Sequence, residues 1–240
     1  MHQHQSEVRE LKREADARLS RLSLLLRMLW VGGVLLAGCL CAMAAKEFAM
    51  PAARAARTYP AHDEHPAEKI TVAIDPYDVD AKASIFSVKY RNFDLVPIFF
   101  VITNDGDQPI SLVGMKAQLN TKDRSKLLPE NKDDLLRRLS RPTRNDRTNT
   151  LPIPLPKKEV KGGVSGKTME EIDEARFGAK AVEPHSTARG FLFFDVTDIS
   201  EPLAGATFYL MGVQDASGKE VMYFEIPLEK YLGSGEGKRP

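Results

Sequence analysis

Residues 62–65, with the sequence His-Asp-Glu-His, carry four adjacent side chains of types that can bind a metal ion. They lie in a stretch without hydrophobic periodicity, where bringing neighbouring ligands together would cost ordering entropy. Asp75, Asp78 and Asp80 could offer oxygens to calcium, but they lack the glycine and the distal glutamate of an EF-hand loop. We therefore predict no metal site and expect a strand-end turn at Pro76 to account for the three aspartates.

The segment from Gly162 to Thr168, GGVSGKT, is similar to a phosphate-binding loop, whose backbone amides encircle phosphates at the spacing G-x-x-x-x-G-K-[ST]. Lys161 occupies the position of the first required glycine, and no strand pattern precedes it. We expect a glycine-rich loop here and predict no nucleotide or other cofactor.

Side chains for nucleophilic or acid–base catalysis are scarce. His185 is the only histidine between residues 69 and 230, and residues 46–240 contain no cysteine, so a triad or a thiol nucleophile has little to draw on. We predict no catalytic residues and a protein that is not an enzyme. The alternative is a carboxylate-dependent hydrolase or carbohydrate-active enzyme, in which acids such as Asp195 and Glu225 meet in a cleft.

The densest positive charge lies in a group of five arginines: Arg137, Arg138, Arg141, Arg144 and Arg147. Residues 121–170 hold 13 lysines and arginines against 7 acids, whereas the whole chain has a net charge of +1. The near-neutral total argues against nucleic-acid binding. The five arginines are a candidate site for anionic lipid headgroups, an acidic cell-wall polymer or a protein partner. The alternative is a solvated loop that wraps the folded part, which is the commoner role of charge runs.

Met28 to Ala45 form 18 uncharged residues, enough for a helix to reach across the hydrocarbon of a bilayer. Positive charge is concentrated before this run, so we expect residues 1–27 to be a charged amphipathic segment in the cytoplasm. Residues 28–45 are then a signal or transmembrane helix, and the rest of the chain lies outside the cytoplasm.

Two processing signals overlap in this helix. Leu36-Ala37-Gly38-Cys39 resembles the lipobox of bacterial lipoproteins, and that resemblance implies a lipid on Cys39. The alternatives are ordinary signal cleavage after the small-x-small pattern at 42–44, and an anchor that is retained. Cys39 could also be a small apolar filler within the helix.

Residues 46–68 alternate alanine, proline and charge without periodicity, which predicts a flexible linker. From residue 69 to residue 230, short apolar runs with a period of two predict strands, and no crossover helices separate them. We expect strands near 70–74, 98–102, 110–113, 190–196, 206–211 and 220–226, with 85–90 as a further candidate. Asp105-Gly106 predicts a hairpin between the second and third of these, and residues 231–240 should form a disordered tail.

An insertion at residues 121–180 is too long for an ordinary connection. We expect a short helix over 129–139, a polyproline II segment over 151–156, and a second helix after a capping box at Thr168-Met169-Glu170-Glu171. The fold class predicted is therefore mainly β, an antiparallel β-sandwich with a long, partly helical insertion.

Residues 99–106 (FFVITNDG) and 190–194 (GFLFF) resemble the immunoglobulin-like domains of small exported bacterial lipoproteins of undefined role. The resemblance implies an immunoglobulin-like sandwich and a role in binding or scaffolding outside the cytoplasm. We accordingly expect a membrane-attached module of the cell envelope, in the periplasm, with a protein or cell-wall partner. It could be an accessory subunit of an envelope complex.

Overall fold

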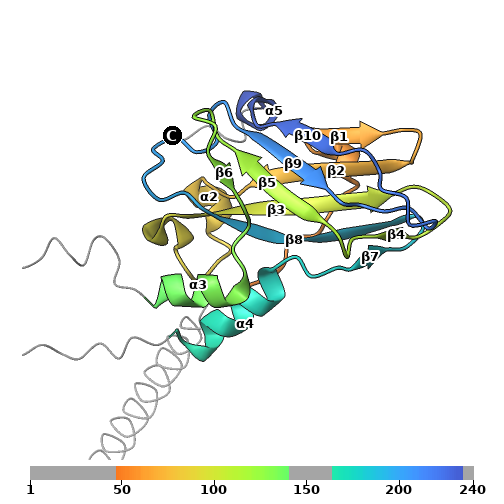
Figure 1. Cartoon of the computed structure of the whole chain (residues 1–240). Helices are drawn as coiled ribbons and strands as arrows, with labels where there is room; N and C mark the ends of the chain where they lie inside the picture. The colour runs from red at the N-terminus through yellow and green to blue at the C-terminus, as the bar shows by residue number, and fades with distance from the viewer. Residues whose placement is uncertain (1–46, 141–163, 235–240) are drawn as a thin grey trace, which may run out of the picture. The chain divides into compact units, whose positions relative to one another are not determined.

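The computed structural model describes residues 47–140 and 164–234 (Figure 1). The predicted cytoplasmic segment 1–27, the helix 28–45 and Cys39 lie outside the described residues, as do the polyproline segment and three of the arginines, Arg141, Arg144 and Arg147. Within 47–140 and 164–234, no helix is both long and apolar enough to cross a membrane.

The fold is mainly β, as predicted, and the named strands pair only in antiparallel fashion. The first sheet has the order β1-β2-β3-β8, and the second has the order β10-β9-β5-β6. The first sheet contains β1 (Ala61–His65), β2 (Ile70–Pro76), β3 (Leu95–Asn104) and β8 (Ser186–Asp195). The second contains β5 (Lys116–Asn120), β6 (Lys126–Leu127), β9 (Thr207–Met211) and β10 (Phe224–Pro227).

Strand β3 is buried along its whole length because both faces of the first sheet are covered. Successive side chains of a strand point to opposite faces. Ile98 and Phe100 therefore join Phe208 of β9 in the core between the two sheets. Phe99 and Val101 point the other way, into a second core on the outer face of the first sheet.

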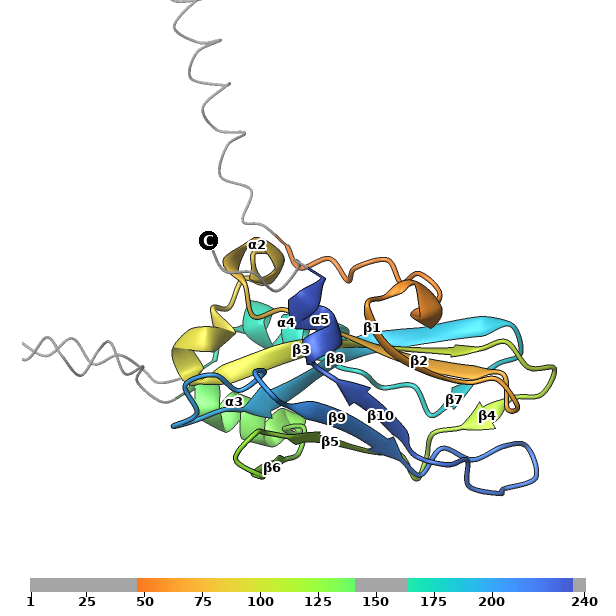
Figure 2. The same cartoon turned by 90° about the horizontal axis from the view of Figure 1, so that it is seen from above.

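Two helices of the predicted insertion cover this outer face (Figures 1 and 2). Helix α3 (Lys132–Leu139) contributes Leu135 and helix α4 (Gly166–Ala175) contributes Ile172, both fully buried. An ion pair of 2.6 Å between Lys132 and Asp173 joins the two helices. The described part of the insertion therefore completes a hydrophobic core, which a loop that only wraps the surface would not do.

The segment predicted to be a linker, 46–68, is built into the fold from residue 47 onward, which corrects that prediction. It contains the 3-10 helix η2 (Ala56–Thr58) and the strand β1, which pairs with β2 over five residues. The backbone N–H of Ala56 donates to Thr103 Oγ1 at 2.9 Å. Small alanines give no hydrophobic period, yet Ala56 and Ala61 are fully buried because they permit close packing.

The predicted hairpin after β3 is also corrected. Asn104 closes the expected turn, because its Oδ1 accepts the N–H of Gly106 at 2.9 Å and its Nδ2 donates to the carbonyl of Gln108 at 2.8 Å. Strands β2 and β8 occupy both edges of β3, so the chain leaves the sheet. It forms β4 (Ile110–Ser111), which pairs with β7 (Ala181–Val182).

The helix starts follow local capping. Asn131 caps α3 by accepting the N–H of Asp134 at 2.9 Å. Ser165 caps α4 by accepting the N–H of Thr168 at 3.2 Å, so this helix begins before the capping box predicted at 168–171 and includes those residues.

Three short helices complete the described chain: α2 (Asp80–Ala83), the 3-10 helix η3 (Tyr90–Phe93) and α5 (Glu229–Gly233). Residues 85–90, the further candidate strand, instead connect α2 to η3. The predicted disordered tail at 231–240 begins too early, because α5 extends into it to Gly233 and Tyr231 is only 1% exposed.

Candidate functional site

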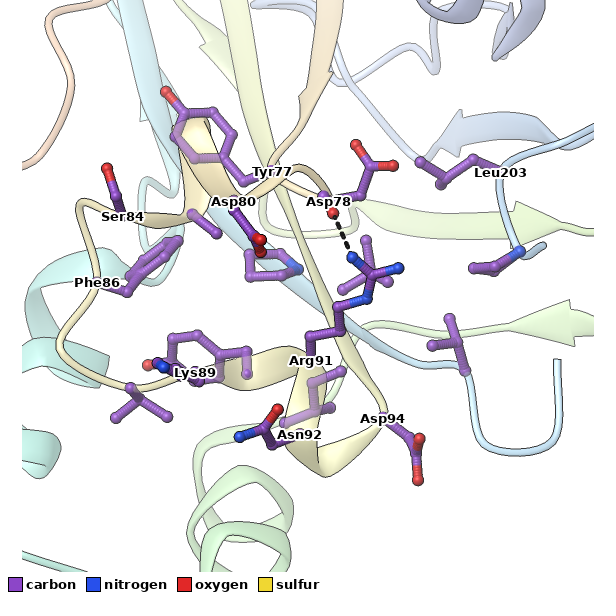
Figure 3. Close-up of a pocket in the computed structure, with 18 of the residues that line it drawn as sticks. Tyr77, Asp78, Asp80, Ser84, Phe86, Lys89, Arg91, Asn92, Asp94 and Leu203 are labelled. Carbon is purple, nitrogen blue, oxygen red and sulfur yellow. Dashed lines mark hydrogen bonds between the residues drawn. The ribbon is translucent and has the colours of Figure 1, made fainter. Parts of the chain in front are cut away.

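A cavity of about 820 Å³ opens at one end of the first sheet. Its walls are the loop of residues 77–94, the beginning of β3, and the loop of residues 196–203 (Figure 3). We call it the β3-end pocket. Because two loops rest on a sheet that is buried on both faces, the pocket has a rigid base and walls that can vary.

Asp94 joins the two walls of the β3-end pocket. It adopts a left-handed backbone (φ 55°, ψ 35°), which reverses the chain between η3 and β3. Aspartate tolerates this conformation better than most residues. The carbonyl of Asp94 accepts the N–H of Val196 at 2.8 Å, so the second loop starts from a fixed point on the first.

Arg91 places its guanidinium inside the pocket. It donates to the backbone carbonyl of Asp78 at 3.4 Å, a long bond that uses one of its five N–H groups. Figure 3 shows Arg91 reaching from η3 toward Asp78, with Asp80 on the α2 side and Asp94 at the other end of the loop. The lining also includes Lys89, so both signs of charge are present.

Helix α2 and Asp78 are held in place by contacts with Asp75 and Tyr231. Lys82 pairs with the buried carboxylate of Asp75. The hydroxyl of Tyr231 lies 3.0 Å from both Asp78 Oδ1 and the carbonyl of Pro76. Of the three aspartates considered for calcium, two are therefore engaged by side chains of this chain, and Asp80 lines the pocket.

Glu171 fixes the far end of the 77–94 loop. Its side chain, in a residue only 3% exposed, accepts the backbone N–H of Ser87 at 2.7 Å, the Ser87 hydroxyl, and the Tyr90 hydroxyl at 3.0 Å. Burial, and then the charge and hydrogen bond of Glu171, raise the pKa of Tyr90 far above its usual range. Tyr90 therefore stays a protonated donor, and both loop residues line the pocket.

Residues 62–65, whose side chains are of types that can bind a metal, lie in β1, where His65 Nε2 is 3.7 Å from Asp63 Oδ2. His62 Nδ1 lies 2.6 Å from the carbonyl of Tyr59, and the ring of His65 stacks on Phe224 with centroids 4.0 Å apart. Asp63 accepts the N–H of Glu225 at 2.9 Å and so joins the two sheets. In the described ranges, no three histidine, cysteine or acidic side chains gather where they could hold a metal.

His185, the one histidine considered for a triad, sits in a turn with a positive φ of 52°. Its Nε2 lies 3.1 Å from Asp107, which also pairs with Lys69. Lys69, and to a lesser extent His185, lower the pKa of Asp107. This exposed cluster joins the turn after β3 to the residues that precede β2 and β8, and it lies outside the lining of the pocket.

The two described arginines of the candidate anion site bind within the chain. Arg137 pairs with Asp134 of the same helix. Arg138 pairs with Asp195 at the end of β8 and donates to Thr197 Oγ1 at 2.9 Å. Arg138 therefore fastens α3 to the first sheet, and anion binding by the five arginines stays a prediction.

The carboxylates of the alternative enzyme hypothesis lie on opposite outer faces. Asp195 alternates with Phe194, which points into the core between the sheets, and it is bound by Arg138. Glu225 alternates with Phe224 on the second sheet and accepts the Tyr209 hydroxyl at 2.8 Å. The inter-sheet core therefore lies between them.

Sequence reasoning missed Arg91, Asp94 and Glu171. A signal for Glu171 exists: it stands four residues before Ala175 on the apolar stripe of a helix, where an acid needs buried donors. A signal for the other two is the length of the 77–94 connection, because loops longer than about 12–15 residues often carry function.

Comparison with known proteins yields little. No family model matches the chain, and no curated protein matches it. One solved structure is similar, that of a "putative lipoprotein (ycdA)" from Bacillus subtilis, with 15% sequence identity and a TM-score of 0.35. The match covers 73% of this chain and 41% of that one, so the chain spans about two fifths of the length of the matched structure.

Proposed function

We propose that this chain is a membrane-attached binding module of the bacterial cell envelope, with its folded part outside the cytoplasm and the β3-end pocket as its ligand site. The observation that carries the binding role is the cavity of about 820 Å³. Its size falls within the range of roughly 300–1,000 Å³ that is typical of ligand pockets.

The composition of the lining supports the same role. Charged groups such as Arg91 and Asp80 share the lining with apolar side chains such as Val196 and Leu203. Ligand sites combine an apolar wall with a few polar groups that fix orientation. The carboxylate of the buried residue Glu171 holds the 77–94 loop through Ser87 and Tyr90, so the geometry of this wall is set by hydrogen bonds.

The sequence supports attachment and export. The uncharged run at 28–45, the positive charges before it and the lipobox-like residues ending at Cys39 favour a lipid-anchored or helix-anchored protein of the periplasm. For the finer fold we propose an immunoglobulin-like sandwich. Two antiparallel sheets around a common core support it, with α3 and α4 added on one outer face.

No specific observation favours the hydrolase alternative, because Asp195 is bound by Arg138 and Glu225 lies on the other sheet. Scaffolding of a larger envelope complex remains compatible with a binding role, since the pocket could receive part of a partner. The ligand site and the anchor are therefore tested separately.

The anchor is tested by intact-mass analysis of the mature protein in membrane and soluble fractions, beside a Cys39→Ala variant. We expect an acylated N-terminus at residue 39 in the parent and none in the variant. An unmodified soluble product from the parent would reject the lipid anchor, and an uncleaved membrane product would replace it with a retained helix.

The pocket is tested with a library of small soluble fragments screened by ligand-observed NMR on the full-length protein. Ser200 lines the pocket and is exposed, so Ser200→Trp should fill the entrance with little effect on folding. Ala216, exposed in a distant turn, supplies the matched control Ala216→Trp. We expect fragments that bind the parent and Ala216→Trp to lose their signal on Ser200→Trp. Equal binding to all three proteins would place the site elsewhere.

A further inference from the structure

The β3-end pocket carries charges of both signs within one cavity. Arg91 and Lys89 are its cations, and Asp78, Asp80 and Asp94 are its anions, so the lining has a net charge of −1. A purely anionic ligand such as a phosphate would be repelled by the excess of carboxylates, and a purely cationic ligand would be repelled by the guanidinium. A ligand that carries both charges can pair with the cations and with the anions of the pocket.

Arg91 has N–H donors available for the negative group of such a ligand, and Asp80 has acceptor oxygens available for its positive group. Arg91 uses one N–H, in a bond of 3.4 Å to a carbonyl. Its planar fork of donors suits a carboxylate, which it can bind through two parallel hydrogen bonds. The carboxylate of Asp80, an exposed residue, makes no hydrogen bond or ion pair within the described chain. It is therefore able to accept from an ammonium group.

Part of the wall is apolar. Val196, Ile199 and Leu203 of the 196–203 loop line the same cavity as the charged residues of the 77–94 loop. Leu203 is 3% exposed and belongs to the core between the sheets, so packing holds this residue of the wall in place. An aliphatic side chain of a ligand can rest on it, and each buried methylene would add about 0.8 kcal/mol of hydrophobic free energy.

We propose that the pocket binds a zwitterionic ligand, an amino acid or the free-ended form of a short peptide, with its carboxylate on Arg91, its ammonium on Asp80 and its apolar side chain against the 196–203 loop. This proposal rests on the proposed function, because it names the ligand class of the same site. The shared chemistry is one ammonium and one carboxylate joined by an apolar body.

The test uses isothermal titration calorimetry on the full-length protein with four probes. They are free leucine, the tripeptide Ala-Leu-Ala with free ends, its C-terminal amide and its N-acetylated form. We expect the free-ended tripeptide or leucine to bind, and each blocked tripeptide to bind at least tenfold more weakly than the free-ended one. Comparing the affinity for leucine with that for the free-ended tripeptide shows whether the ligand is an amino acid or a short peptide.

Two variants assign the charges. Arg91→Gln should weaken the free-ended ligand about tenfold and leave the amide unchanged, because the amide has no carboxylate to lose. Asp80→Asn should also weaken the free-ended tripeptide about tenfold. It should leave the N-acetylated tripeptide unchanged, because that form has no ammonium to lose. The matched controls are Arg189→Gln and Asp123→Asn, which replace exposed residues outside the pocket and should bind like the parent.

The outcomes separate this proposal from the one it rests on. If Arg91→Gln weakens the free and the amidated tripeptide equally, or weakens neither, the zwitterion proposal fails. If no probe binds but fragments still bind in a way that Ser200→Trp abolishes, the ligand class is wrong and the pocket stands. If no probe or fragment is sensitive to Ser200→Trp, both proposals fail.

Discussion

The carboxylate of Glu171 accepts the backbone N–H of Ser87 at 2.7 Å, although 84 residues separate the two in the chain. This contact joins helix α4, in the insertion, to the loop that walls the β3-end pocket. The Glu171 side of the contact is buried, and the carboxylate takes up a backbone donor that has no strand partner. The insertion therefore helps to position the pocket.

Replacing this acid should loosen the loop. Glu171→Ala leaves the buried Tyr90 hydroxyl without an acceptor, which typically costs about 1–3 kcal/mol, and it also removes the acceptor of the part-buried Ser87 amide. We expect a lower free energy of unfolding in urea and faster amide hydrogen exchange at Ser87 and its neighbours. Glu170→Ala, at the adjacent exposed position, is the control and should stay within about 0.5 kcal/mol of the parent. Unchanged exchange in Glu171→Ala would contradict this role.

Tyr90 predicts a dependence of stability on alkaline pH. Its pKa is raised in the folded state, so folding favours the protonated phenol. That contribution is complete below the unfolded pKa of about 10 and is lost as the pH rises above it. Tyr90→Phe should lower the free energy of unfolding by about 1 kcal/mol at neutral pH. Between about pH 9 and 11, however, the variant should lose less stability than the parent, because it has no phenol to ionise. Urea midpoints measured across this range test it, and parallel losses in both proteins would disprove it.

Gly190 should tolerate no side chain. A Cβ there would lie 2.5 Å from the Cα of Phe177, whose N–H donates to the carbonyl of Phe191 at 3.0 Å, so backbone would have to move. We expect Gly190→Ala to destabilise the protein by about 1–3 kcal/mol. Gly178→Ala is the matched control, because no atom lies within 4 Å of its added Cβ. Thermal unfolding of the two variants gives the comparison, and equal midpoints would contradict the close approach.

The pair formed by Arg138 and Asp195 should be energetically coupled. Their side chains are 20% and 34% exposed, so solvent screens the pair and we expect a coupling of about 1 kcal/mol at most. A double-mutant cycle with Arg138→Gln and Asp195→Asn measures it. Arg138→Gln should leave binding to anionic lipid vesicles unchanged. If the effects of the two single substitutions on stability add, or if Arg138→Gln weakens vesicle binding, Arg138 would instead belong to the anion-binding site predicted from the sequence.

Strands β2, β3 and β8 of the first sheet were predictable because a hydrophobic pattern is a local property of the chain. Residues 70–74 show it, and β2 is the strand found there. Residues 98–102 form a continuous apolar run, which fits a strand buried on both faces. The strand partners were not predictable in the same way. Asp105-Gly106 encodes a turn, but the occupied edges of β3 decide that no hairpin follows.

The pocket was beyond prediction because its parts meet only in the tertiary fold. Asp94 and Val196 are 102 positions apart, and their contact depends on β3 pairing with β8. Segment 47–65 was hidden for a different reason. Its buried residues are mainly alanines, whose small side chains carry no strong hydrophobic signal and pack closely only where a sheet face already exists.

A cysteine at position 200 tests export and ligand binding together. Spheroplasts carrying Ser200→Cys are treated with a membrane-impermeant maleimide, with and without the free-ended tripeptide, beside Ala216→Cys and the parent chain. The account predicts that both new cysteines react from outside and that the tripeptide slows only the reaction at position 200. Labelling only after lysis, or equal rates at position 200 with and without the tripeptide, would contradict it.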